Sequence, residues 1–167
     1  MNQDLKKSIN DVLQACDNVN EMIFPDDESG HRLADEVKAD LFWFVAFLTL
    51  SDDIMTSDEL AALNEYFGTE YTTDDIAAFS EREGILDEQA VNSVPLSINY
   101  LIRIDNMFYN DRGMVTNCSA TLIELYKKLG MEFICCDKLL DMNEYKQYNE
   151  YISMLEDFAQ SNLDSQE

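Results

Sequence analysis

Glycine, proline and histidine are scarce in this chain, and each scarcity excludes something. Five glycines and two prolines among 167 residues leave few turn-forming positions, which disfavours a β fold with many tight turns. One histidine and four cysteines without a CxxC pair give no spacing typical of a zinc site. The chain also lacks a GxxxxGK[S/T] phosphate loop and any signature of an activated nucleophile, so we expect no enzymatic activity.

Long hydrophobic runs are absent as well. The most apolar stretch, 41–50, is too short to span a bilayer and suits a central core helix. Residues 1–7 are mostly polar and show no apolar core of a signal peptide. Buried, reduced thiols are the simplest interpretation of the cysteines, which are Cys16, Cys118, Cys135 and Cys136. We therefore expect a cytoplasmic protein that makes no membrane contact.

Positive charge is the third thing that the chain has little of. Eleven basic residues face thirty-four acidic ones, which gives a formal net charge of −23. Small soluble domains usually carry a net charge of magnitude roughly 2–8. Such an excess of negative charge repels nucleic acids and anionic membranes and attracts basic proteins or cations. We therefore expect no direct binding of DNA or RNA.

The hydrophobic pattern predicts one all-α domain over 1–167, a compact bundle of about six to eight helices. Residues 1–30 form an N-terminal helix and loop, 33–160 the core, and 162–167 a frayed tail. The sequence Thr56-Ser57-Asp58-Glu59 has the form of a capping box and starts a helix that stops at Gly68. A later helix over 120–129 is expected to be closed by Gly130.

Two segments of the chain match each other, 47–60 and 132–145. Asp52 pairs with Asp137 and Glu59 with Glu144, both at an offset of 85 residues (137 − 52 and 144 − 59). Each copy consists of an apolar helix, an aspartate at its end, a turn with an apolar residue, a capping residue and a glutamate in the next first turn. The match predicts a pseudo-repeated unit of helix, acidic turn and helix.

This pattern, Asp-x-x-[apolar]-[Ser/Thr/Asp]-x-x-Glu after an apolar helix, resembles the TerB-like domain of tellurite-resistance and related stress proteins. The resemblance covers about 33–158 and includes Leu129-Gly130-x-Glu132-Phe133 before the second turn. It implies an all-helical domain with two acidic turns, of the type found ahead of AAA+ ATPase domains in some bacterial proteins. The chain departs from the family at Asp53 and Lys138, where the family usually has glycine.

The four acids of the repeated unit have two interpretations. Hard cations such as Ca²⁺ and Mg²⁺ prefer clustered oxygen ligands, which Asp52, Glu59, Asp137 and Glu144 would supply. Neither segment has the twelve-residue ligand spacing of an EF-hand loop. Helix capping and turn formation explain the same residues without any metal.

Asp105 is a second candidate site residue, because it continues the apolar stripe of Ile98, Leu101 and Ile102. An acid at the edge of a buried helix face has the placement of a binding-site or catalytic carboxylate with a shifted pKa. The alternative is that Asp105 pairs with a nearby base, Arg103 or Arg112, or reaches solvent.

Three tyrosines, Tyr145, Tyr148 and Tyr151, are predicted to lie on the last helix. Core packing is the simplest interpretation of this spacing. An aromatic face that binds a protein is the alternative.

Three hypotheses for function follow from these features. The first is a protein-interaction adaptor of a bacterial stress or defence system that acts with an AAA+ ATPase. The second is an acidic mimic of nucleic acid that inhibits a DNA- or RNA-binding protein, and it rests on the net charge of −23. The third is a stress protein that binds a divalent cation at the acidic turns.

Overall fold

The computed structural model describes residues 2–23, 32–50, 55–83, 93–135 and 142–164, with side chains described except at 79–83. Seven helices lie in these ranges, and no strand does. The predicted all-α fold is therefore confirmed for the described part of the chain. The helices are α1 (Gln3–Ile23), α2 (Leu33–Thr49), α3 (Ser57–Phe67), α4 (Thr73–Glu83), α6 (Leu96–Arg112), α7 (Cys118–Ile134) and α8 (Met142–Asn162).

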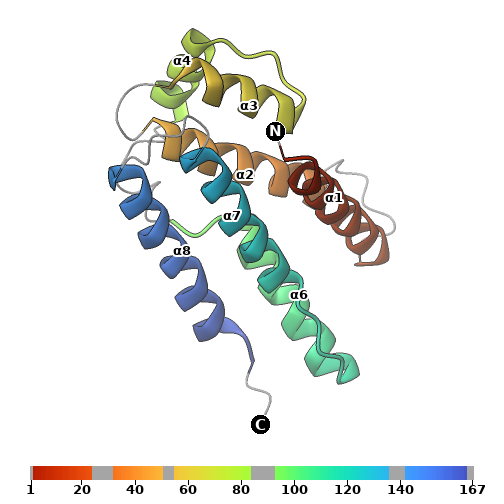
Figure 1. Cartoon of the computed structure of the whole chain (residues 1–167). Helices are drawn as coiled ribbons and strands as arrows, with labels where there is room; N and C mark the ends of the chain where they lie inside the picture. The colour runs from red at the N-terminus through yellow and green to blue at the C-terminus, as the bar shows by residue number, and fades with distance from the viewer. Residues whose placement is uncertain (1, 24–31, 51–54, 84–92, 136–141, 165–167) are drawn as a thin grey trace.

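The helices are arranged around α2 and α7 (Figure 1). Helix α7 packs against α1, α2, α6 and α8. Helix α2 packs against α1, α6, α7 and α8, and also against α3. In Figure 1, α6, α7 and α8 run side by side, α2 runs across them, and α3 and α4 lie at one end of the molecule. This leaves one flank of α8 at the edge of the bundle.

Helix α2 is apolar on nearly all sides because it is surrounded. Its central residues Val37, Leu41 and Val45 are fully buried, as the apolar stretch in the sequence predicted. Phe44 joins three helices: its ring meets Tyr126 of α7 edge-on at 5.0 Å between centroids and stacks on Tyr151 of α8 at 4.9 Å. Burial of such aromatic side chains is a main source of stability in a bundle of this size.

Glycines end two of the helices, and the left-handed backbone there explains why. Gly68 follows α3 with φ 67°, and Gly113 follows α6 with φ 62°, a conformation that other residues adopt at a cost. The prediction that Gly130 closes a helix is wrong, since α7 continues through it to Ile134. Gly130 is instead buried where α7 meets α8, and a Cβ there would lie 2.6 Å from the Tyr148 ring.

The two matching segments of the sequence have matching helix bounds. Helices α2 and α7 both have 17 residues, and their first residues (33 and 118) and last residues (49 and 134) are each 85 apart. Helices α3 and α8 also begin 85 residues apart, at 57 and 142. The residues that end α2 and α7, Leu50 and Cys135, have nearly the same backbone angles, φ −98° and −99°. Residues 51–54 and 136–141, in the turns that follow α2 and α7, lie outside the described residues.

None of the described helices combines the length and the apolar character that crossing a bilayer requires.

Candidate interaction surface

Two of the four predicted metal ligands, Asp52 and Asp137, lie outside the described residues. The other two are in first turns of helices, Glu59 in α3 and Glu144 in α8, and both are buried, with 4% and 7% exposed. Within the described ranges no group of three or more His, Cys, Asp or Glu side chains is placed to hold a metal ion.

Glu59 forms the capping box that the sequence predicted. Its carboxylate accepts a hydrogen bond from the backbone N–H of Thr56 at 2.7 Å, and its own N–H donates to the Thr56 hydroxyl at 3.3 Å. Both partners therefore satisfy amides that the start of a helix leaves open. The capping interpretation of Glu59 is confirmed, while the cation hypothesis stays a prediction.

Asp105 is buried, with 4% exposed, and it caps the start of the next helix. One carboxylate oxygen accepts from the Thr116 hydroxyl at 2.6 Å and from Cys118 N at 3.0 Å. The other accepts from Ser119 N at 2.9 Å and from the Ser119 hydroxyl at 2.7 Å. Burial raises the pKa of Asp105, but these four hydrogen bonds outweigh it and hold the pKa below its usual value.

The four donors belong to Thr116, Cys118 and Ser119 around the start of α7, so Asp105 stabilises the fold there. Its role as a binding-site or catalytic carboxylate stays a prediction. The predicted alternative, pairing with Arg103 or Arg112, is wrong because hydroxyl and amide donors take that place. The hydrogen-bond partners of Asp105 lie 11 to 14 residues further along the chain, so local spacing in the sequence did not reveal its role at the start of α7.

A second buried contact of the same kind was not predicted. Asp40 of α2 accepts a hydrogen bond from Ser97 N in the first turn of α6 at 3.0 Å, and burial raises the pKa of Asp40. Tyr66 of α3 likewise joins distant helices: its hydroxyl accepts from Asn2 N at 2.9 Å and donates to Glu132 of α7 at 2.7 Å. In the described structure, the hydrogen bonds of Asp40 and Tyr66 thus connect the ends of different helices.

Three exposed hydrophobic side chains belong to the end of α7 and the start of α8. We call Met131, Met142 and Tyr145 the α7–α8 patch; Met142 is the most exposed of them at 68%, and Met131 and Tyr145 are exposed by more than a third. The Tyr145 ring stacks on Tyr148 at 6.3 Å between centroids, and the Tyr148 hydroxyl donates to the Lys127 carbonyl at 3.2 Å. The patch is therefore supported from beneath by the contact between the two helices.

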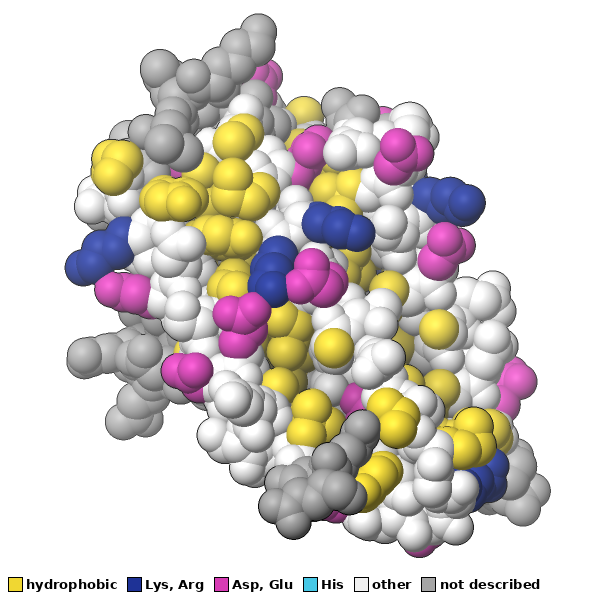
Figure 2. All heavy atoms as spheres, turned by 60° about the horizontal axis from the view of Figure 1, so that its bottom comes forward, with side chains coloured by type: hydrophobic (Ala, Val, Ile, Leu, Met, Phe, Trp, Pro, Cys, Tyr) yellow, Lys and Arg dark blue, Asp and Glu magenta, His cyan; other side chains and the backbone are white. Residues whose placement is uncertain are grey.

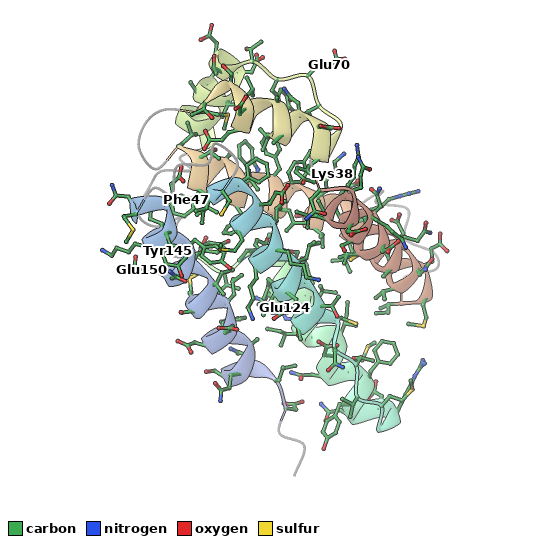
Figure 3. The ribbon with its side chains drawn as sticks, in the orientation of Figure 1. Lys38, Phe47, Glu70, Glu124, Tyr145 and Glu150 are labelled. Carbon is green, nitrogen blue, oxygen red and sulfur yellow. The ribbon has the colours of Figure 1, made fainter. Side chains whose placement is uncertain are left out.

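Of the three predicted tyrosines, one is on the surface and two are in the core. Tyr148 is buried, and Tyr151 packs against Phe44, so core packing is confirmed for these two. Tyr145, labelled on α8 in Figure 3, is exposed by 37%. Of the three tyrosines, Tyr145 is therefore the one that remains for the interpretation as an aromatic protein-binding face.

Charged side chains border hydrophobic ones on the surface, as Figure 2 shows for one face of the molecule. Near the α7–α8 patch, Lys127 forms ion pairs with Glu124 at 2.6 Å and with Glu156 at 2.7 Å. These two glutamates raise the pKa of Lys127 through hydrogen bonds. The pair with Glu156 links α7 to α8 and offsets part of the acidic charge at this contact.

The α3–α4 hairpin carries the most one-sided charge of the described structure. Over residues 55–78 the chain has six acids and no base, and all of these acids except Glu59 are exposed. Glu70, between the two helices, points away from the rest of the molecule (Figure 3). The exposed acids are Asp58, Glu65, Glu70, Asp74 and Asp75.

Comparison with known proteins yields no match, whether to protein-family models, to curated proteins or to solved structures. The TerB-like resemblance thus rests on the residues of the repeated unit alone.

Proposed function

We propose that this chain is a non-catalytic protein-binding module that docks a partner through the α7–α8 patch. One observation carries the proposal. Met131, in the last turns of α7, and Met142 and Tyr145, in the first turn of α8, are exposed in a chain that has three times as many acids as bases. Methionine and tyrosine are favoured at protein interfaces, since one adapts its shape and the other provides a large area at low entropic cost.

The repeated unit suggests which class of partner to test. The matching bounds of α2 and α7, and of the starts of α3 and α8, agree with a repeated unit, and the residues of that unit are what resembles TerB-like domains. Modules of that kind precede AAA+ ATPase domains in some bacterial proteins. The first partner to test is therefore an AAA+ ATPase of a cytoplasmic stress or defence system.

The proposal is tested by affinity capture from a native bacterial lysate, with washes at low and high salt. Wild type is expected to retain the same ATPase at both salt concentrations, because apolar contacts are not screened. The double variant Met142→Gln/Tyr145→Gln should lose it. Met114→Gln removes a comparably exposed methionine between α6 and α7 and should bind as wild type does. Retention of no protein, or equal retention by all three proteins, would contradict the proposal.

A second candidate function, mimicry of nucleic acid, is favoured by the α3–α4 hairpin. Its exposed carboxylates give a basic nucleic-acid-binding protein a surface to bind. The variant Glu65→Gln/Glu70→Gln/Asp74→Asn would then weaken capture, while the α7–α8 variant would not. Binding by mimicry must also compete with duplex DNA or RNA and fall steeply with salt.

A further inference from the structure

A groove on another part of the molecule has the chemistry of a ligand site. It lies where the end of α1 and the start of α2 meet α6, with a volume of about 380 Å³. This is within the range of roughly 300–1,000 Å³ that is usual for small-molecule sites. Most of its lining is apolar, from Val19, Ile23, Leu33, Ile104 and Met107.

Two arginines, Arg32 and Arg103, line the same groove. In the part of the chain that the structure describes, neither is in an ion pair. Glu36 also lines the groove, so among the described lining residues two positive charges meet one negative charge. This local excess of positive charge stands against a chain that has three times as many acids as bases.

Residues at the start of α2 line the groove as well. Arg32 precedes the first turn of α2 and makes no side-chain cap there. The Leu33 amide is 3.4 Å from the side-chain oxygen of Asn20, at the long limit of a hydrogen bond. The amides of this first turn contribute positive potential, which Asp35 and Glu36 of the same turn partly offset.

We propose that this groove binds a monoanionic amphiphile, an aliphatic chain that ends in one carboxylate. The apolar lining takes the chain, and the guanidinium groups of Arg32 and Arg103 take the carboxylate, which is the anion that arginine binds in a two-pronged geometry. The net charge of −23 decides against a multiply acidic peptide as the ligand, because repulsion grows with each added carboxylate. A single carboxylate is attracted to the two guanidinium groups at short distance, where salt screens the attraction least.

Calorimetric titration of the full chain with decanoate tests the proposal, with decanol as the neutral analogue. Decanoate should bind at one saturable site and more tightly than decanol. In the variant Arg32→Gln/Arg103→Gln, the affinity for decanoate should fall by about tenfold or more, while that for decanol stays the same. Methyl NMR signals of Ile23, Leu33 and Ile104 should shift on binding in wild type.

Two controls make the result specific. Lys38→Gln removes an exposed base from α2 outside the groove and should leave decanoate affinity unchanged. The α7–α8 variant Met142→Gln/Tyr145→Gln should also bind decanoate normally, so this test is independent of the proposed function. Unsaturable binding, equal affinity for decanoate and decanol, or an equal loss in Lys38→Gln would overturn the proposal. So would tighter binding of a short apolar peptide with a free C-terminal carboxylate.

Discussion

Asp105 shows how a single buried carboxylate can hold two helices of this protein together. Asn at this position keeps one acceptor but places an amide donor among the donors of Thr116, Cys118 and Ser119. We expect Asp105→Asn to lower the free energy of unfolding by about 2–4 kcal/mol at neutral pH, because hydrogen bonds to a charged acceptor are lost.

The same residue predicts a pH dependence. The pKa of Asp105 is lowered in the folded protein, so its contribution to stability is full above the unfolded pKa. That contribution disappears as pH falls through the folded pKa. The stability difference between wild type and Asp105→Asn should therefore narrow towards about pH 3 in urea unfolding. A difference that stays constant with pH would show that the charge of Asp105 is not what stabilises α7.

Two buried tyrosines are expected to respond in opposite ways to loss of their hydroxyl groups. The Tyr66 hydroxyl joins Asn2 and Glu132, so Tyr66→Phe should cost about 1–3 kcal/mol of unfolding free energy. The Tyr126 hydroxyl is fully buried beside the Ser97 side chain, and their contact lacks the geometry of a hydrogen bond. Tyr126→Phe should change stability by less than about 0.5 kcal/mol or increase it. Equal losses in denaturant titrations would refute this distinction.

At the scale of helices, Gly130 sets how closely α7 and α8 approach. A Cβ at this position would lie 2.6 Å from the Tyr148 ring and 3.1 Å from the Phe44 ring. Gly130→Ala should therefore destabilise the protein by about 1–3 kcal/mol, although alanine is favoured over glycine in a helix by about 1 kcal/mol.

A double-mutant cycle identifies the cause. If the clash is with the Tyr148 ring, Gly130→Ala should cost less in a Tyr148→Leu background than in wild type. The same cost in both backgrounds, measured by thermal unfolding, would contradict a close approach of α7 and α8 at Gly130.

Local signals in the sequence predicted helix ends well. Contacts between different helices could not be predicted from such signals. The capping box of Thr56 and Glu59 and the stop at Gly68 depend only on neighbouring residues, so both were predicted and both are confirmed. Gly130 was misjudged because a glycine that ends a helix and one that admits a neighbouring ring look alike in sequence. The partners of Asp40 and Asp105 lie on other helices and could not be read from local spacing.

At the scale of the whole molecule, the net charge of −23 should oppose folding through repulsion among the acids. Sodium chloride at about 0.5 M should therefore raise the Tm above its value at about 0.05 M, because salt screens this repulsion.

A comparison of CaCl₂ with NaCl at the same ionic strength distinguishes binding of Ca²⁺ from charge screening. An additional increase in Tm with Ca²⁺ that Glu144→Gln abolishes would support the cation hypothesis, whereas equal Tm values would count against it.

The central claim is that a protein partner docks on the α7–α8 patch. Site-specific photo-crosslinking in living bacteria tests it most directly, with a benzophenone amino acid placed at Tyr145 in the patch, at Glu70 in the α3–α4 hairpin, or at Met114 as an exposed control. We expect a discrete crosslinked partner from position 145 and none from 114. A partner captured from position 70 and not from 145 would contradict it and assign binding to the acidic hairpin.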